Sequence, residues 1–380
     1  MTRPKRVWEI SASYFLRDPR VRREAEALAD AGWQVDVICL RAPGEPATGE
    51  LGAIRIRRLP LARRRGSKAR YLLEYGAFFA AASALLTRNH LRRRYDLIHV
   101  HNMPDLLVFA AWLPKLTGTP IVLDVHDPMP EVFQARFGLA PGHPFSRALR
   151  WQERLSFSFA DHLITTHELI RQLYARSAPP SKMSAVMNVP DPKLFEPIRN
   201  RAPQRRFTLV YTGTVTAPYG LDVAVHAVAK LRTEIPDVRL RIIGDGDDLE
   251  RVKQLSANLN LAGHVEFVPP VTLDRIPGIL SAADVSLVPH RDDPIMPWCF
   301  STKLVEALRV GLPVICARAK ALTHYFDDTM VAYVEPGNAD DLAAQALRYH
   351  RDPALGARMV GNARRFFAEH SWEHERSRFY

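Results

Sequence analysis

Cysteine is scarce in this sequence, and its first residues do not resemble a leader. Cys39, Cys299 and Cys316 are the only cysteines in 380 residues, too few and too far apart for a disulfide framework or a cysteine-based zinc site. The first ten residues lead directly into a strand-like run, without the apolar core or cleavage site of a signal peptide. We therefore expect a protein of a reducing compartment, the cytoplasm.

Long apolar runs are also scarce. The apolar and aromatic run at residues 71–86 contains Glu74 and is shorter than the roughly 20 residues that span a bilayer, so we expect it not to cross a membrane. Residues 55–70, directly before it, carry eight basic side chains and no acidic one. The whole net charge of +11 comes from residues 1–190.

This basic segment has two interpretations that stay open here. A basic cluster beside an apolar helix is suited to docking on an anionic membrane, at about 1 kcal/mol for each basic group. This interpretation assigns a membrane or acceptor surface to Arg63, Arg64, Arg65 and Lys68. The other is a solvated loop followed by an ordinary core helix. Nucleic acid is not an expected partner, because aromatic residues are not interleaved with the basic ones.

Strand-like and helix-like segments alternate along the chain, which is typical of α/β domains with parallel sheets. A length of 380 residues with 47% hydrophobic residues is enough for two cores. Residues 191–206 are rich in proline and charge and are the best candidate for a linker. We expect a first domain at 1–190, a second at 207–355 and a C-terminal helix at 356–380. The alternation predicts strands at 6–11, 33–40, 96–101, 120–125, 162–166, 184–188, 207–212, 238–243, 265–268 and 285–288, and helices at 21–31, 106–116, 146–160, 168–177, 220–235, 247–259 and 273–282.

The segment from Met296 to Ala317 combines a helix start, an embedded acid and a strand start. Ser301 or Thr302 can cap the helix and Gly311 can end it. Unpaired amides at a helix start favour an anion, and Lys303 and Glu306 could add a phosphate contact and a hydroxyl acceptor. A sugar nucleotide carries both groups. The alternative is a capped surface helix packed in an α/β domain.

Glycines recur where ligand contacts of α/β proteins lie, after the predicted strands. Gly213 and Gly220 follow one strand, and Gly244 and Gly246 follow the next. Loops also favour glycine for backbone reasons alone. These glycines point to a ligand chiefly because they accompany the segment 296–317.

Together with these glycines, the segment 296–317 resembles the donor half of retaining glycosyltransferase family 4 enzymes. Its spacing of Ser301, Lys303 and Glu306 is similar to a subset that often acts in bacterial surface polysaccharide assembly. The resemblance implies the glycosyltransferase B fold, in which two Rossmann-like, doubly wound α/β domains face each other across a cleft. It also implies that the last helix, 356–380, returns to the first domain.

The resemblance implies the following donor contacts in this chain. Loop 213–220, with Gly213 and Thr214, would cover the diphosphate, and Gly244 and Gly246 would adjoin the nucleoside. Val268 would offer backbone groups to the base, and Glu306 would accept hydrogen bonds from the ribose. Phosphate charge would be met by Ser301, Thr302 and Lys303.

Two departures from the family pattern concern this donor site. The family usually has a second glutamate eight positions before the ribose-binding one, and that position is Trp298 here. Arg and Lys often stand in the loop after the first strand of the donor half, where this chain has Thr214 and Tyr219. Lys303 is then the nearest substitute for the missing phosphate-binding charge, and Arg291 is a weaker one.

In the first half, His126 and Asp127 follow a predicted strand directly. A histidine there could hydrogen-bond a donor sugar, as resemblance to the family also implies, so we expect His126 to be catalytic and Asp127 to position it. His99 and His101 also end a strand and suggest a metal. Without a third partner at ligand spacing, we expect no metal. The family implies no cofactor either, because the nucleotide sugar is a substrate.

The sequence therefore predicts an enzyme, a glycosyltransferase of the hexosyltransferase type. It would move a sugar from a nucleotide-sugar donor to a lipid-linked or polysaccharide acceptor of cell-envelope glycan synthesis, with retention of configuration. Its expected place is the cytoplasm, with peripheral attachment to the inner face of the membrane if the basic segment docks there. Two alternatives stay open: a noncatalytic glycosyltransferase-like subunit, and a sugar-nucleotide epimerase of the same fold.

Overall fold

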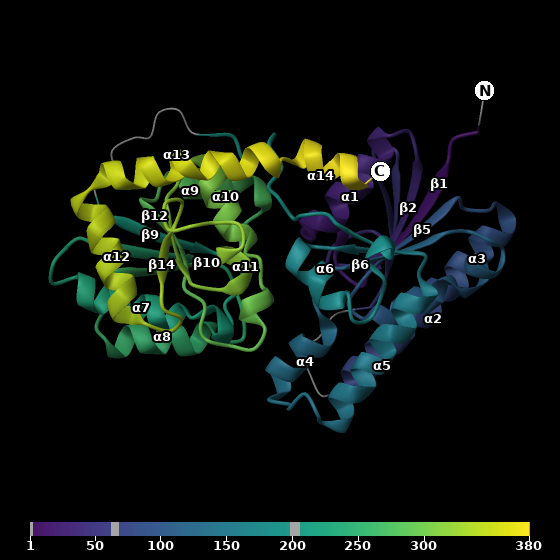
Figure 1. The fold of residues 1–380 in the computed structure, drawn as a ribbon, viewed down its shortest axis with the longest axis horizontal. Coiled ribbons are helices and arrows are strands. Elements are labelled where there is room, and N and C mark those ends of the chain that lie inside the picture. Colours follow the sequence, from purple (N-terminus) through teal and green to yellow (C-terminus); the bar gives the residue numbers. More distant parts are fainter. Residues whose placement is uncertain (1–2, 62–67, 198–205, 380) are drawn as a thin grey trace. The chain divides into compact units, whose positions relative to one another are not determined.

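The computed structural model describes residues 3–61, 68–197 and 206–379, and the chain divides into two compact units (Figure 1). The first unit is Met1–Asn188 with Arg376–Tyr380, and the second is Val189–Glu375. Residues 198–205 of the linker predicted at 191–206 lie outside the described residues.

The described part of the first unit is built on an eight-stranded sheet of order β3-β4-β2-β1-β5-β6-β7-β8. All pairs are parallel except β3 with β4. Its inner strands are almost continuously buried, as expected of a sheet covered on both faces. The strands are β1 (Arg6–Ile10), β2 (Gln34–Leu40), β3 (Thr48–Leu51), β4 (Ile54–Leu59), β5 (Leu97–His101), β6 (Ile121–Val125), β7 (His162–Thr165) and β8 (Met183–Ala185).

Helices cover both faces of this sheet, α1 on one face and α2, α3 and α5 on the other (Figure 1). Helix α1 starts at Pro19, and Asp18 caps it by accepting a hydrogen bond from the Val21 amide at 3.3 Å. The helices are η1 (Phe15–Arg17), α1 (Pro19–Asp30), α2 (Lys68–Arg92), η2 (Asp105–Ala111), α3 (Trp112–Leu116), α4 (Met129–Phe137), α5 (Pro144–Phe159), α6 (Glu168–Tyr174) and η3 (Pro180–Lys182), where η marks a 3-10 helix.

The structure corrects the sequence prediction at two places in this unit. The helix predicted at 106–116 is a 3-10 helix, η2, that continues into the short helix α3. The first part of the basic segment is strand β4, in which Ile54 and Ile56 are buried and Arg55 and Arg57 are exposed. Arg58 is buried against Glu45 at 3.2 Å and is therefore not part of a solvated basic loop.

The described part of the second unit has a six-stranded parallel sheet of order β11-β10-β9-β12-β13-β14. Helices α7 and α8 lie on one face, and α9, α10 and α13 on the other (Figure 1). The strands are β9 (Thr208–Thr212), β10 (Arg239–Ile243), β11 (Val265–Val268), β12 (Val285–Val288), β13 (Val314–Ala317) and β14 (Ala332–Val334). The helices are η4 (Ala217–Tyr219), α7 (Leu221–Leu231), α8 (Leu249–Asn258), η5 (Leu273–Arg275), α9 (Ile276–Ser281), η6 (Met296–Trp298), α10 (Thr302–Val310), α11 (Lys320–Thr323), α12 (Ala339–Arg351) and α13 (Pro353–Glu369).

The chain ends in helix α14 (Trp372–Phe379), whose last turn belongs to the first unit. Phe379 packs against the core of that unit and its ring lies 5.6 Å from the ring of His99. Arg376 lies 3.4 Å from Asp30 at the end of α1. The C-terminal helix predicted at 356–380 is thus two helices, α13 and α14, with only the end of the second in the first unit. In the described segments, no helix is long and apolar enough to cross a membrane.

Candidate functional site

Helix α10 begins at the carboxyl ends of the strands of the second unit. Ser301 occupies its N-cap position, as predicted, and Gly311 ends it with a φ of 94°. However, the Ser301 side chain makes no capping hydrogen bond. Its hydroxyl is buried and, among the residues described, without a partner. The start of α10 therefore has amide groups and a hydroxyl available for a ligand.

Three glycines hold the loops beside α10 in close backbone contact. The amide of Gly213 donates to Ile243 O at 2.9 Å, and that of Gly244 donates to Val268 O at 3.0 Å. A Cβ atom on Gly244 would lie 1.8 Å from the carbonyl oxygen of Gly213, and one on Gly246 would lie 1.8 Å from that of Val215. Side chains are excluded at these positions because the backbones themselves touch. The loops predicted to bind the donor are thus assembled into one surface.

Lys303 reaches from the first turn of α10 to this surface. Its Cε lies 2.5 Å from where a Cβ of Gly213 would be, and its Nζ is 4.5 Å from the ring centre of Tyr219 and 5.5 Å from that of Tyr211. It makes no ion pair with any described residue. Burial lowers the pKa of Lys303, although Cys299 and Glu306 act in the opposite direction. This half-buried cation therefore has no described carboxylate paired with it.

The remaining predicted donor residues surround this lysine or lie in the same loops. Thr302 and Glu306 are half-buried in α10. Thr214 is exposed, and its carbonyl accepts a hydrogen bond from the Tyr211 hydroxyl at 2.5 Å. The carbonyl of Val268 is engaged by Gly244, so a ligand would have to use other backbone groups there. Arg291 pairs with Asp222 and lowers its pKa against the effect of burial, so it is not the spare cation that the sequence suggested.

His290 is a residue of this site that the sequence analysis missed. It is 1% exposed, its ring stacks on Tyr219 at 5.3 Å, and in the described structure neither ring nitrogen has a hydrogen-bond partner. Burial and the nearby charge of Lys303 lower the pKa of His290 to about 3, so the ring is neutral. Its place two residues after the end of strand β12 was the signal that could have identified it.

His126 lies at the corresponding edge of the first sheet, directly after β6. Its amide donates to Asn102 Oδ1 at 2.7 Å, which fixes the loop. Its Nε2 is 3.1 Å from both Asp124 Oδ2 and His101 Nδ1. Burial opposes the charged form, but Asp124 raises the pKa of His126 above its usual value. The carboxylate at this ring thus belongs to Asp124, whereas the predicted positioning residue, Asp127, is exposed.

Comparisons with known proteins place each half of the chain in a family. Residues 18–188 match the family described as glycosyl transferase 4-like domain, and residues 193–366 match glycosyl transferases group 1. Residues 18–188 and 193–366 thus match two glycosyl transferase domains in succession. The first unit contains the 4-like domain with His126, and the second contains the group 1 domain with Lys303.

Relatives of known name agree with this assignment. The chain is 28% identical over 305 residues to a D-inositol 3-phosphate glycosyltransferase of Salinispora arenicola, a match that covers 73% of this chain. Matches to this enzyme and to its Streptomyces avermitilis counterpart span 66% and 63% of the relatives' own lengths.

Solved structures show the same fold. Sucrose-phosphate synthase from Thermosynechococcus elongatus superimposes with a TM-score of 0.80 at 22% identity, over 98% of this chain and 96% of that one. Anabaena Alr3699/HepE in complex with UDP-glucose superimposes with a TM-score of 0.72 at 15% identity, over 98% of each chain. The predicted glycosyltransferase B fold, with two Rossmann-like domains, is confirmed.

Trp298 and the basic residues at 63–68 were also part of the sequence prediction. Trp298, at the position of the usual second glutamate, ends η6, and Lys320 Nζ lies 4.7 Å from its ring centre. Arg63, Arg64 and Arg65 lie outside the described residues, and Lys68 is the first residue of α2.

Proposed function

We propose that this protein is a glycosyltransferase that binds a nucleotide-sugar donor in its group 1 domain. The observation that carries the proposal is Lys303, a half-buried cation without an ion pair to any described residue, at the start of α10. A diphosphate would supply the missing negative charge and accept hydrogen bonds from the helix amides. The UDP-glucose complex of the Anabaena neighbour supports a donor of this class.

The other donor contacts follow from the same surface. The loops of Gly213, Gly244 and Gly246 pack closely on one another and on Lys303, so their exposed backbone groups would form one surface for a nucleotide. Glu306, half-buried in α10 three residues after Lys303, would accept hydrogen bonds from the ribose. Catalysis would be mainly electrostatic, because oriented amides and Lys303 stabilise the leaving diphosphate. We further propose retention of configuration and a hexose as the transferred sugar.

The experiment that tests this function is a thermal-shift screen with sugar nucleotides, followed by turnover assays on polyprenyl-linked and polysaccharide acceptors. A glycosyltransferase requires both a donor and an acceptor for product. Conversion of the donor sugar without acceptor would identify an epimerase instead. Donor binding without turnover on any acceptor would favour the noncatalytic alternative, which Trp298 at the position of the usual glutamate keeps open.

Replacing His126 with alanine should lower turnover about tenfold while nucleoside diphosphate affinity stays unchanged. The expected loss corresponds to one hydrogen bond of about 1.5 kcal/mol to the donor sugar, which the nucleotide alone does not use. Steady-state kinetics and a nucleotide titration on the same preparations measure both quantities. Replacing the exposed His226 of α7 with alanine is the matched control. Full activity of His126→Ala would remove His126 from the site.

We also propose that the 4-like domain docks on an anionic membrane and there meets a lipid-linked acceptor. Helix α2, which follows the basic segment, exposes Leu73 and Leu91 at 74% and 70%. Helix α5 exposes the large side chain of Trp151 at 65%. Apolar side chains of this kind enter the headgroup region while basic groups attract anionic lipids.

Vesicle sedimentation tests this docking surface. We expect the protein to sediment with anionic vesicles at low salt and to be released as salt rises, since the Debye length is about 8 Å at physiological ionic strength. Replacing Arg63, Arg64, Arg65 and Lys68 with serine should reduce sedimentation and leave nucleotide binding intact. If the unaltered protein ignores anionic vesicles at low salt, the basic segment is solvated surface.

A further inference from the structure

The face of the first sheet beneath α1 carries a buried polar cluster. Strand pairing sets Glu9 of β1 beside His99 of β5, and His101 of β5 beside Asp124 of β6. Side chains two residues apart on a strand share a face, so the strands alone bring these four groups together. Helix α1 adds Glu24 from above, and the five side chains are at most 1% exposed.

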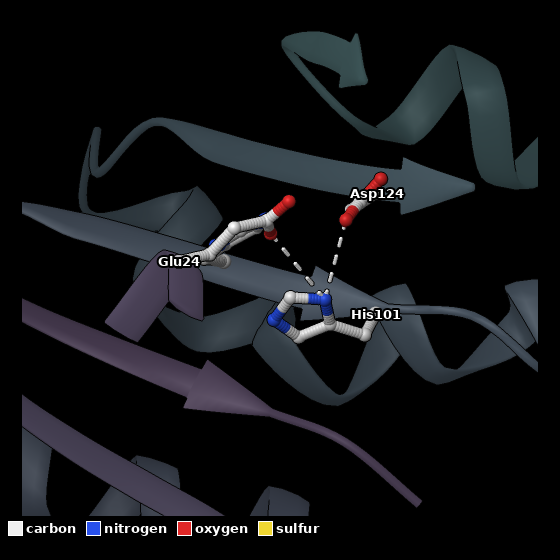
Figure 2. Close-up of side chains that lie close together, drawn as sticks. Glu24, His101 and Asp124 are labelled. Carbon is white, nitrogen blue, oxygen red and sulfur yellow. Dashed lines mark ion pairs between the residues drawn. The ribbon is translucent and has the colours of Figure 1, made fainter. Parts of the chain in front are cut away.

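Both histidines of this cluster lie between the same two glutamates, but through opposite ring nitrogens. His99 turns Nε2 toward Glu24 Oε2 at 3.7 Å and Nδ1 toward Glu9 Oε1 at 3.6 Å. His101 turns Nδ1 toward Glu24 Oε2 at 3.9 Å and Asp124 Oδ2 at 3.4 Å, and Nε2 toward Glu9 at 4.0 Å. Figure 2 shows Glu24, His101 and Asp124 pointing toward one another. Each imidazole thus faces Glu24 on one side and Glu9 on the other.

The charges of the cluster do not balance. Three buried carboxylates face one buried guanidinium, that of Arg20, which lies 2.7 Å from Asp124 and 3.1 Å from Glu24, and the ring of His126 lies 3.1 Å from Asp124 at the edge of the cluster. With neutral imidazoles this leaves two negative charges in a site without water access, which is costly unless they are neutralised. Two protons or one divalent cation would restore neutrality.

The distances favour a cation. In the described structure, Oε2 of Glu24 and Nε2 of His99 have no hydrogen-bond partner, whereas Nδ1 of His101 lies 3.1 Å from Nε2 of His126. On the side of Glu24, Nε2 of His99 and Nδ1 of His101 lie 3.7 and 3.9 Å from Oε2 of Glu24, which is too long for a shared proton to form a good hydrogen bond. An ion at about 2.0 to 2.2 Å from each ligand atom would occupy that space. One ligand atom from each of Glu24, His99, His101 and Asp124 lies within 4.8 Å of the other three.

We propose that Glu24, His99, His101 and Asp124 bind a divalent transition metal of the zinc class. Two imidazoles and two carboxylates suit zinc. Glu9 lies behind both histidines, 3.6 Å from Nδ1 of His99 and 4.0 Å from Nε2 of His101, in the place of the outer-shell carboxylates that orient the histidines of zinc sites. Asp124 would bind through Oδ2 while Arg20 holds the same carboxylate. The ion would join α1 to β5 and β6 below His126, so its role is structural. The sequence analysis expected no metal because His99 and His101 lacked a third ligand nearby in the sequence. The fold brings Glu24 and Asp124 to them.

The test is the metal content of the untagged full-length protein, purified without chelator after growth in zinc-supplemented medium. We expect about one zinc per chain by mass spectrometry, and a visible d–d spectrum after replacement by Co²⁺. Stripping with 1,10-phenanthroline should lower Tm by on the order of 5 °C, and added Zn²⁺ should restore it. None of these readouts involves a donor or acceptor, so they do not depend on the proposed transferase function.

Two variants localise the ion. Glu24→Gln removes a ligand at nearly constant volume and should weaken zinc binding at least tenfold. His90→Gln changes a histidine that is equally buried but hydrogen-bonded to Thr117 at 2.8 Å, outside the cluster, and should keep full zinc content. Equal losses of bound zinc in Glu24→Gln and His90→Gln would overturn the assignment. If Glu24→Gln does not fold, the unaltered protein decides: no stoichiometric zinc and no Tm response to Zn²⁺ would mean that the cluster is neutralised by protons.

Discussion

Replacing Lys303 with methionine is expected to weaken nucleoside diphosphate binding by about 3 kcal/mol, roughly 150-fold, and to leave nucleoside binding nearly unchanged. Only the diphosphate presents charge to this side chain, and a charge-assisted hydrogen bond in a half-buried site is worth that much. Methionine lacks the Nζ that lies over the rings of Tyr211 and Tyr219, but it keeps the apolar stem beside Gly213, so the packing there should survive. Isothermal titration with both ligands gives the two affinities.

Lys253→Met is the matched control for this comparison. Lys253 is an exposed lysine of the same domain, and it pairs with Glu250 at 2.7 Å on α8. We expect its loss to leave both affinities unchanged, because exposed ion pairs contribute little. If Lys303→Met lowers nucleoside and nucleoside diphosphate affinity equally, the lysine supports the loops and does not bind phosphate.

Replacing Gly244 with alanine should destabilise the group 1 domain by about 3 kcal/mol or more and abolish nucleotide binding. The new Cβ would lie 1.8 Å from the carbonyl oxygen of Gly213, and the φ of 154° is one that L side chains rarely adopt. Backbone cannot yield as a side chain can, so the loops after β9 and β10 must separate. Chemical denaturation measures the loss of stability, and titration of nucleotide measures the loss of the site.

Gly263→Ala provides the comparison, because no atom lies within 4 Å of its would-be Cβ. We expect this variant to change the free energy of unfolding by less than about 1 kcal/mol and to bind nucleotide normally. A stable Gly244→Ala protein that binds nucleotide would show that these two loops do not need their close contact.

Much of this fold could be predicted from sequence, because apolar strands and amphipathic helices alternate with clear boundaries. The strands at 265–268 and 285–288 are examples. Hairpin β3–β4 was missed because Arg55 and Arg57 are exposed on a strand whose alternate side chains are buried. The sequence analysis assigned these charged residues to a basic loop, although apolar and charged residues alternate there with the period of two that is typical of a strand.

Part of the donor surface could also be predicted, because local sequence marks the ends of strands and the starts of helices. Lys303 and the glycines lie at strand ends and helix starts, positions that local sequence marks. Arg291 could not be assigned correctly, because its partner, Asp222, lies 69 residues away. The cluster around His101 was missed because pairing of β1, β5 and β6, together with the placement of α1, joins residues that no local spacing connects.

The central claim, that the group 1 domain binds a nucleoside diphosphate through Lys303, is tested most directly by calorimetric titration of the full-length protein. UDP, GDP and ADP would each be compared with the corresponding nucleoside. We predict that at least one diphosphate binds with a micromolar dissociation constant and its nucleoside about 100-fold more weakly, and that Lys303→Met removes most of this difference. Diphosphates that bind no better than their nucleosides would contradict the account.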